Sequence, residues 1–307
     1  MEGEERARRR TVGCCILNWN AGDALTECVR ALQNSSCQLD LDILVVDNAS
    51  TDDSLATLAR DLPAIPVLQT GRNLGYAAGN NRGAAVLLDR GCDFLLFINP
   101  DARVFPDAVQ AFVDGLDRQA TIGWIGSASV DPRGRVVDVA VARLPWVRQM
   151  TTARLTRLFV RESGPDRQET ADGERFGVCG ACVMFRADAF RQIGGFDEAT
   201  FLYKEEYIVA ERMRAKGWSA LWLARPLYAH TVGLCTDLIP FARELHKIRS
   251  EQHLLKHYWR WPWAGRNALR LLRYADFAAF VVYRCLVRSR RPSRRQIAEK
   301  GRSAAAS

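Results

Sequence analysis

The sequence predicts an α/β protein in which helices cover both faces of a mostly parallel central sheet. Short segments that are apolar throughout indicate strands of a sheet that is buried on both faces. These segments alternate with stretches in which apolar residues recur at helical spacing, which is typical of β-α-β units. Ligands of such proteins bind beyond the carboxyl ends of the strands. Because polar residues follow several of the apolar segments, we expect a binding site at that edge of the sheet.

The first half of the chain carries this alternation. Strands are predicted where apolar residues run almost unbroken: 12–17, 42–46, 65–70 and 93–99. Helices are predicted where apolar residues recur every three or four positions: 25–32, 55–62 and 109–116. A further helical stretch is predicted between the third and fourth strands.

The second half is less regular. Residues 124–144 lose the helical period and indicate a hairpin around the turn 131–134. Residues 145–175 are polar, basic and without a pattern, which predicts a mobile excursion. Strands are expected again at 176–185 and 217–224.

The composition indicates a globular protein with an unusual distribution of charge. The chain has 307 residues, of which 48% are apolar and 25% charged, so it can bury a sizeable core. Residues 240–307 contain 16 Lys or Arg and 4 Asp or Glu, whereas the rest of the chain contains 27 and 31. A mildly acidic body is therefore followed by a strongly basic tail.

The cysteines and the apolar runs bear on the compartment. The nine cysteines show no regular spacing, and Cys14 and Cys15 are adjacent within a predicted strand, so buried thiols in a reducing cytosol fit better than a disulfide framework. Residues 1–10 are predicted to be a disordered arm, and no apolar segment of a signal peptide follows them. No run reaches the roughly 18 apolar residues of a membrane-spanning helix. We therefore expect a cytoplasmic protein.

The strand at 93–99 runs directly into Pro100 and Asp101. Proline fixes φ and lacks a backbone donor, so it interrupts the strand and presents Asp101 in a defined direction. In isolation such a sequence is more often a turn than a metal site. Mg²⁺ or Mn²⁺, however, takes one or two carboxylates together with phosphate oxygens and water. His230, which follows a later strand, is either a satisfied core histidine or a ligand of the metal or the diphosphate.

Polar residues at the ends of the first two strands suit a nucleotide. Asn18 and Asn20 end one strand and Asp47 ends its neighbour, so amides and a carboxylate cluster where they could read a nucleobase and its ribose. For Asp47 alone, a cap of the following turn is the simpler interpretation.

The stretch 71–83 is rich in glycine and asparagine. Its glycines at positions 71, 75 and 79 are four apart, so it is not a dinucleotide-binding fingerprint. One interpretation is a flexible loop that enters a helix of small residues. The other is a diphosphate site, because Asn73 and Asn80 supply amides next to arginines.

Two adjacent glutamates begin a predicted helix. Glu206 shares an apolar stripe with Val209 and Met213, three and seven positions further on. A partly buried carboxylate has a raised pKa and can act as a general base near neutral pH. Glu205 lies about 100° away around the helix and is the second catalytic candidate, so either glutamate is open as the base. For Glu205 a surface position favoured by the helix dipole remains the alternative.

Other acidic and sulfur-containing residues lie on turns before this helix. Asp197 and Glu198 follow two glycines and are candidates for binding an acceptor. Cys179 and Cys182 have the spacing of a zinc-ligand pair, but a structural zinc site needs two more ligands and no second pair exists. We interpret both cysteines as small core residues.

The basic tail has features of a membrane-surface helix. Trp259, Trp261 and Trp263 surround a proline, and the mostly apolar segment 277–287 is followed by a basic one. A basic amphipathic helix with tryptophans suits an anionic membrane surface. A face that packs back on the domain and nucleic-acid binding are the alternatives. The tryptophans favour the membrane, and no nucleic acid is expected.

Four segments, in order, resemble glycosyltransferase family 2, especially its rhamnosyltransferase-like branch: VVDNASTDDS, NLGYAAGNNRGA, FINPDA and GGFDEATFLYKEE…ERMRAKGW. The resemblance covers about 11–235 and implies a GT-A (nucleotide-diphospho-sugar transferase) fold with an inverting, single-displacement mechanism. It implies that Asp47 contacts the base, Asn99 the ribose region and Asp101 the Mg²⁺ or Mn²⁺ that bridges the diphosphate. Glu206 stands where the family has an aspartate that deprotonates the acceptor hydroxyl, so Glu-Glu replaces Glu-Asp here.

These observations lead to a specific expectation. A GT-A domain at 11–235, with a nucleotide-binding half at 11–120 and an acceptor half at 121–235, precedes a helical, basic, membrane-associating extension at 236–307. It would move a sugar, rhamnose or another deoxysugar, from a nucleoside-diphosphate donor to a hydroxyl of a lipid-linked or polysaccharide acceptor at the inner membrane face. The alternative is a membrane-associated sugar-nucleotide binder without turnover. A nucleotidyltransferase would need further acidic metal ligands near Asp101, and none are apparent.

Overall fold

The computed structural model describes residues 9–137, 140–141, 171–231 and 240–290. These residues fall into two compact units. The first unit contains every strand in the described residues and continues as far as Arg260. The second contains the last described helix.

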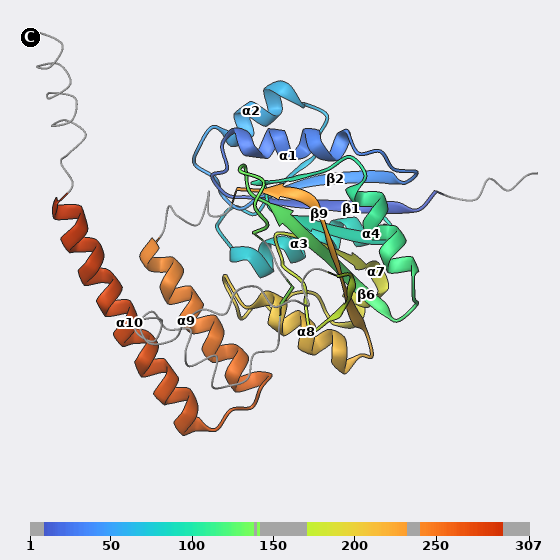
Figure 1. Ribbon diagram of the computed structural model, residues 1–307. Coiled ribbons are helices and arrows are strands. Elements are labelled where there is room, and N and C mark those ends of the chain that lie inside the picture. Colours follow the sequence, from blue (N-terminus) through green and yellow to red (C-terminus); the bar gives the residue numbers. More distant parts are fainter. Residues whose placement is uncertain (1–8, 138–139, 142–170, 232–239, 291–307) are drawn as a thin grey trace, which may run out of the picture. The chain divides into compact units, whose positions relative to one another are not determined.

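A nine-stranded sheet forms the centre of the first unit (Figure 1). Four strands from the first half of the chain are parallel and lie in the order β3-β2-β1-β4. Their bounds are β1 Thr11–Asn18, β2 Asp40–Asp47, β3 Val67–Gln69 and β4 Phe94–Ile98. Each coincides with one of the predicted apolar runs, so the first half is as expected.

The second half makes the sheet mixed. Its strands are β5 Ala102–Val104, β6 Ile122–Val130, β7 Gly173–Arg175, β8 Cys182–Arg186 and β9 Ser219–His230. Strand β8 runs antiparallel to both of its neighbours, β4 and β6, whereas β6 and β9 are parallel. The edge strands β5 and β7 are antiparallel to β9. The predicted parallel arrangement therefore holds from β3 to β4 and between β6 and β9.

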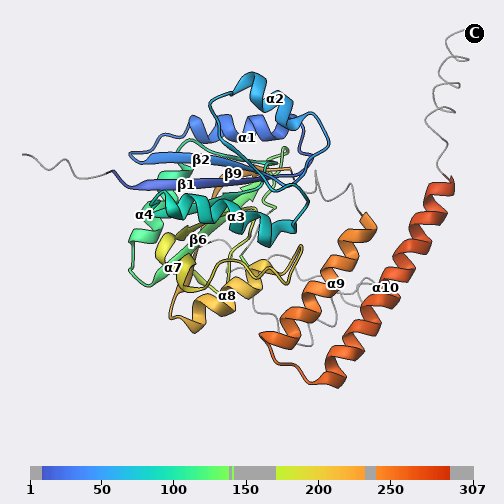
Figure 2. The same cartoon turned by 180° about the vertical axis from the view of Figure 1, so that it is seen from behind.

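Helices cover both faces of the sheet, as predicted, and Figures 1 and 2 show α1 and α2 on one side and α3, α7 and α8 on the other. The helices of the first unit are α1 Asp23–Gln33, α2 Ser54–Asp61, α3 Gly75–Asp89, α4 Ala108–Asp117, α7 Ala187–Gln192, α8 Glu205–Ala215 and α9 Pro240–His257. Successive side chains of one strand point to opposite faces of the sheet and pack in different core clusters. Cys14 packs in the core cluster under α1 and α4, and Cys15 in the cluster under α3 and α8.

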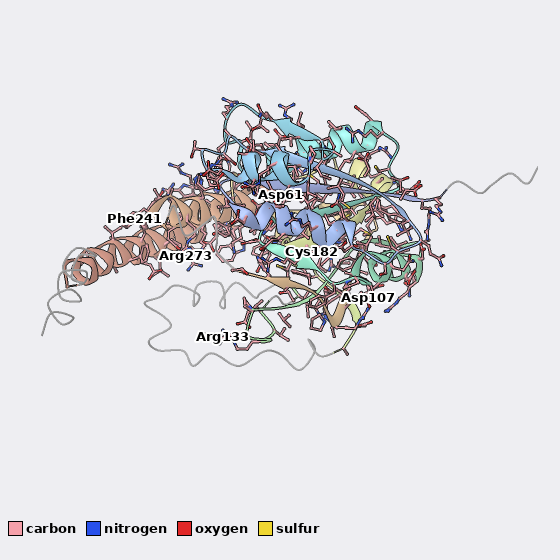
Figure 3. The ribbon with its side chains drawn as sticks, turned by 90° about the horizontal axis from the view of Figure 1, so that it is seen from above. Asp61, Asp107, Arg133, Cys182, Phe241 and Arg273 are labelled. Carbon is pink, nitrogen blue, oxygen red and sulfur yellow. The ribbon has the colours of Figure 1, made fainter. Side chains whose placement is uncertain are left out.

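No disulfide links the seven cysteines whose side chains the structure describes. All seven have free thiols, and Cys14, Cys15 and Cys28 are buried. Burial raises the pKa of Cys15 to about 12, so this thiol is neutral. Cys182 is also buried, within the sheet at the start of β8 (Figure 3).

Three predictions for the irregular part of the chain have different outcomes. The hairpin turn at 131–134 is confirmed by an antiparallel bridge between Val130 and Val136. Gly173–Arg175 is a strand rather than part of an excursion, while 142–170 lie outside the described residues. The strand predicted at 176–185 begins only at Cys182, and the residues from 178 to 181 belong to a loop.

The second unit is described by the helix α10, Trp263–Arg290. A hydrogen bond from the backbone N–H of Arg266 to the carbonyl of Pro262 closes its first turn. Among the described helices, none combines the length and the apolar character that crossing a bilayer requires. The predicted arm at 1–8 and the end of the basic tail, 291–307, lie outside the described residues.

Candidate active site

A cavity of about 300 Å³ opens at the carboxyl ends of β1 and β4. Residues from seven separate parts of the chain line it: Leu17, Trp19, Asn48, Asn73, Gly75, Tyr76, Asn99, Pro100, Asp101, Cys179, Gly180, Ala181, Phe201, Leu202, Tyr203, Glu205, Glu206 and His230. The cavity therefore lies at the sheet edge where the sequence predicts a site. It brings Asp101 and the two adjacent glutamates into one space.

Asp101 and His230 are neighbours although they are far apart in the chain. Strand β4 ends at Ile98, and the turn that follows leads into β5, where Ala102 pairs with His230 at the end of β9. The carbonyl of Asp101 accepts a hydrogen bond from the N–H of Thr231, at 3.1 Å, which extends this pairing by one residue. The side chains then meet at 3.4 Å between Oδ1 of Asp101 and Nε2 of His230, and each side chain is only 8% exposed.

This pair fits a divalent cation that is completed by a ligand. The 3.4 Å between the two side-chain atoms is close to the roughly 3 Å that separates neighbouring ligand atoms of a cation bound at about 2.1 Å. Within the described part of the chain, no group of three or more His, Cys, Asp or Glu side chains is arranged to hold a metal by itself. Any cation here would therefore need oxygens from a bound molecule.

The charge of the lining points the same way. Asp101, Glu205 and Glu206 supply three carboxyl groups, whereas no Lys or Arg occurs among the described residues that line the cavity. A diphosphate placed here without a cation would meet side chains of its own sign. A bound cation would offset that repulsion.

Helix α8 places the two glutamates at its first turn. The residues before it, Tyr203 and Lys204, have left-handed backbones with φ of 73° and 74°. Such conformations are strained for residues with a side chain, and the surrounding structure has to hold them. They turn the chain sharply, so that α8 begins with Glu205 facing the protein.

The burial of the glutamates differs from the prediction. Glu205, expected about 100° from the apolar stripe, is only 6% exposed and shares the buried face with Ile208 and Val209. Glu206, expected on that stripe, is partly buried and lines the cavity. The apolar stripe of the sequence omitted Ile208, three residues after Glu205, and that residue is fully buried.

The environment of Glu205 opposes ionisation. Burial and, next, the charge of Glu206 raise the pKa of Glu205 to about 8, although backbone donors of Glu205 and Tyr203 act in the opposite direction. Among the described residues, no donor reaches Oε1 of Glu205, which is fully buried. The pair thus consists of a buried carboxyl group and a more accessible one beside it.

Close backbone contacts fix the walls of the cavity. Gly75 has φ of 82°, and a Cβ atom there would lie 2.3 Å from the carbonyl oxygen of Phe201. The next residue, Tyr76, donates its backbone N–H to that carbonyl and its hydroxyl to the carbonyl of Gly180, both at 2.8 Å. At Gly180 a Cβ would lie 3.2 Å from Oε1 of Glu206. These contacts join the start of α3 to the two segments that face it.

The predicted nucleotide residues divide into two groups. Asn73 and Asn99 line the cavity, together with Asn48, which the prediction missed. Nδ2 of Asn48 donates to Oδ1 of Asn73, at 2.9 Å, and Oδ1 of Asn48 accepts the backbone N–H of Leu74, also at 2.9 Å. These bonds hold the loop before α3 against the end of β2.

The other predicted residues lie behind the cavity and shape its loops. Asn18 is fully buried, and its Nδ2 donates to Asp47, Ser50 and Ser54. Asp47 also accepts the backbone N–H of Ser50, and Oδ1 of Asn20 accepts that of Thr51. The cap interpretation therefore describes Asp47 in this structure. A fourth predicted residue, Asn80, is buried in α3, where its Nδ2 donates to the carbonyl of Tyr76.

Asp197 and Glu198 do not line the cavity. Oδ2 of Asp197 accepts hydrogen bonds from Tyr258, at 2.6 Å, and meets Nε2 of His253, at 2.8 Å. Burial opposes its ionisation, but these partners and the backbone of Ala199 outweigh burial and lower the pKa of Asp197 to about 2. Glu198 accepts a hydrogen bond from Asn81. Both side chains hold parts of the protein together.

Several cavity residues were missed by the sequence reasoning, among them Trp19, Asn48 and Cys179. Trp19 lies between two asparagines that were noted, and Asn48 follows an aspartate that was noted, so the correct strand ends were identified but not the correct side chains. Cys179, interpreted as a core residue, lines the cavity, whereas Cys182 is in the core as predicted. Nothing in the local pattern separates these two cysteines.

Known proteins resemble the chain in sequence. Residues 14–194 match the family model described as Glycosyl transferase family 2. Two relatives from Mycobacterium tuberculosis, strains CDC 1551 / Oshkosh and H37Rv, are each 28% identical over 250 residues, which is 75% of this chain and 81% of the relative. Both are named N-acetylglucosaminyl-diphospho-decaprenol L-rhamnosyltransferase.

Solved structures resemble the chain in fold. GalNAc-T7 with UDP, GalNAc and Mn²⁺ is 13% identical with a TM-score of 0.55, and the match covers 73% of this chain and 44% of that one. S. aureus TarS 1–349 in complex with UDP-GlcNAc is 13% identical with a TM-score of 0.52, over 88% of this chain and 73% of that one. At such identities the likeness establishes a shared fold.

Proposed function

Because the chain belongs to glycosyl transferase family 2 and is therefore an inverting glycosyltransferase with a nucleotide-sugar donor, we propose that it transfers a deoxysugar, rhamnose first among them, to a hydroxyl of a lipid-linked or polysaccharide acceptor. The names of the mycobacterial relatives support both the sugar and the lipid-linked acceptor. The apolar part of the cavity wall, which includes Leu202 and Pro100, is compatible with a sugar that carries a methyl group.

One observation carries the proposal: Asp101 and Glu206 line the same cavity. Transfer to a hydroxyl needs charge stabilisation at the departing diphosphate and a base at the incoming oxygen. A carboxylate beside a histidine on one wall and a partly buried carboxylate on another could supply these two functions to a single bound donor.

In the proposed reaction, Glu206 accepts the proton of the acceptor hydroxyl while that oxygen bonds to the anomeric carbon of the donor sugar. The bond between the anomeric carbon and the diphosphate oxygen breaks, and its electron pair leaves with the nucleoside diphosphate. Because the attack comes from the face opposite to the leaving group, the anomeric configuration inverts.

Asp101 and His230 are the residues that would hold Mg²⁺ or Mn²⁺. A bound cation would offset the negative charge that grows on the departing diphosphate. Support comes from the 3.4 Å spacing of the two side chains and from the lack of Lys or Arg among the described lining residues. The Mn²⁺ named with GalNAc-T7 is consistent with this assignment.

The nucleoside of the donor would lie near the ends of β1 and β2. Trp19 offers an aromatic face, while Asn48 and Asn73 offer amides at the same wall. Asn99 would lie near the ribose. Asn18, Asn20 and Asp47 would act indirectly, by holding the loops that carry these groups.

Two substitutions test the proposal. With a panel of nucleoside-diphosphate sugars that includes rhamnose donors, Glu206→Gln should lower transfer by about 10²–10⁴-fold, because the general base is lost, while calorimetry still detects donor binding. Asp101→Ala should remove the cation dependence of that binding. Glu198→Gln serves as the control, because Glu198 is a carboxylate that does not line the cavity.

The alternative has a distinct outcome. If the wild-type protein bound a donor with cation but neither transferred nor hydrolysed it with any acceptor offered, the protein would be a binder without turnover. Activity in Glu206→Gln close to that of the wild type would reject the assigned base.

A further inference from the structure

The cavity presents more carboxyl groups than the proposed reaction uses. Asp101 is assigned to the cation and Glu206 to the proton transfer, which leaves Glu205 without a role. If it were ionised, Glu205 would add a second negative charge directly beside Glu206, in a cavity that must accept a diphosphate. The position of Glu205 therefore calls for an explanation in terms of its protonated form.

The side chain of Glu205 is built into the wall and has one unused oxygen. The residue is 6% exposed, and it lines the cavity. Within the described part of the chain its Oε1 has no hydrogen-bond partner, although the backbone N–H groups of Glu205 and Tyr203 act on the carboxyl group. A buried oxygen without a partner opposes the ionised form of a carboxyl group more strongly than the neutral form, so the neutral form fits this position.

We propose that Glu205 works as a neutral carboxylic acid that binds a sugar hydroxyl in the cavity, while Glu206 alone exchanges a proton with the acceptor. The proposal rests on the proposed glycosyl transfer and assigns the substrate contact of the buried member of the pair. A protonated carboxyl group can donate through its O–H and accept through its other oxygen. That combination matches a sugar hydroxyl, which both donates and accepts.

The groups around Glu205 favour this form. Glu206 follows it in α8, Tyr76 approaches from α3, and Cys179 comes from the loop before β8. Among the described residues, Lys204 is the cation that lowers the pKa of Glu205. Its effect is smaller than those of burial and of Glu206. Burial first, and then Glu206, raise the pKa of Glu205 to about 8. The hydroxyl of Tyr76 also stays protonated, because burial raises its pKa well above the usual value.

Matched substitutions separate the two glutamates. Glu205→Gln keeps the shape and a neutral donor, so its transfer rate at pH 7 should stay within about fivefold of the wild type, whereas Glu206→Gln should lose about 10²-fold or more. Glu205→Ala removes the substrate contact and should lower kcat/KM about 10- to 100-fold. Above pH 8 the wild type should lose activity as Glu205 ionises, and Glu205→Gln should lose less.

The affected step identifies the hydroxyl. If Glu205→Ala weakens donor binding in calorimetry and slows donor hydrolysis without acceptor, the hydroxyl belongs to the donor sugar. If only the KM for the acceptor rises, the hydroxyl belongs to the acceptor. Unchanged kinetics in Glu205→Ala would reject a substrate contact altogether.

A direct readout comes from the wild-type protein, and one variant assigns it. Infrared difference spectra of the full-length wild-type protein, recorded as pH is raised from 6 to 9, should show the C=O stretch of a protonated carboxyl disappear near pH 8, and Glu205→Gln should lack that band. A wild type that transfers sugar but shows no protonated carboxyl at pH 7, or a Glu205→Gln variant as inactive as Glu206→Gln, would overturn the inference and leave the proposed function intact. A wild type without transfer would instead contradict the proposed function.

Discussion

At the scale of single residues, the carboxyl group of Glu205 links the stability of the fold to pH. Its pKa is raised from 4.5 to about 8, so between these values the folded protein binds a proton that the unfolded chain releases. The contribution of Glu205 is therefore fully present below pH 4.5 and is lost as pH rises toward 8, by about 1.4 kcal/mol per pH unit. Above pH 8 the loss is complete.

The Glu205→Gln variant should remove this dependence. Relative to the wild type, its free energy of unfolding should rise with pH between 4.5 and 8 by a few kcal/mol and then level off, as measured by urea denaturation at pH 5, 7 and 9. Glu27→Gln is the control, because Glu27 is half exposed and pairs with Arg103, so its effect should vary little with pH. A constant offset between Glu205→Gln and the wild type would show that Glu205 titrates normally.

At the scale of elements, α9 supports the segment that carries the glutamates. The ring of His246 stacks on Phe201, with centroids 4.3 Å apart and planes 19° apart. The hydroxyl of Ser250 donates to the carbonyl of Leu202, at 2.9 Å. These contacts are made just before Tyr203 and Lys204, whose strained backbones precede the start of α8. No described residue of α9 lines the cavity, so we expect the helix to act on the proposed base through this segment.

Loss of the stacked ring should affect turnover more than donor binding. His246→Ala should lower kcat about 10-fold, because a misplaced catalytic group slows the reaction strongly, while the affinity for donor, measured by calorimetry, changes by less than about threefold. Lys256→Ala, on an exposed position of the same helix, is the control. An equal loss of donor affinity and kcat would mean that α9 supports the whole cavity instead.

The elements also show how far sequence reasoning reaches. The parallel strands β1, β2 and β4 were predictable because each is a local apolar run, and local runs need no knowledge of partners. The strand predicted at 176–185 overlaps β8 only from Cys182 onward. The position of β8 between β4 and β6 depends on pairings across many residues, which a local pattern does not contain. The stripe that favoured Glu206 over Glu205 failed because it left out Ile208, which lies three residues after Glu205 and is fully buried.

At the scale of the whole molecule, charge is divided between the body and the tail. The compact first unit continues through α9 to Arg260, and the basic segment follows it. We propose that this segment, with α10, binds an anionic membrane surface, where each Lys or Arg near the surface contributes about 1 kcal/mol. An enzyme with a lipid-linked acceptor would benefit from such contact.

Neutralising the tail tests this in the full-length chain. Five arginines are replaced by glutamine: Arg288, Arg290, Arg291, Arg294 and Arg295. The variant should sediment with phosphatidylglycerol vesicles at least tenfold less than the wild type, and its transfer to a soluble acceptor should remain unchanged. Phosphatidylcholine vesicles, which lack net charge, are the control and should sediment neither protein. Undiminished sedimentation of the variant with anionic vesicles would reject the electrostatic anchor.

The approach of Gly75 to Phe201 has a consequence for how this enzyme could change over evolution. The contact joins two segments that line the cavity and leaves no room for a side chain at Gly75, so the spacing of these segments hardly depends on the other side chains of the lining. Replacements at Cys179 or Leu202 could therefore change the preferred sugar without changing that spacing. The distance between the proposed cation site and the proposed base, in contrast, is set by the backbone and would change little.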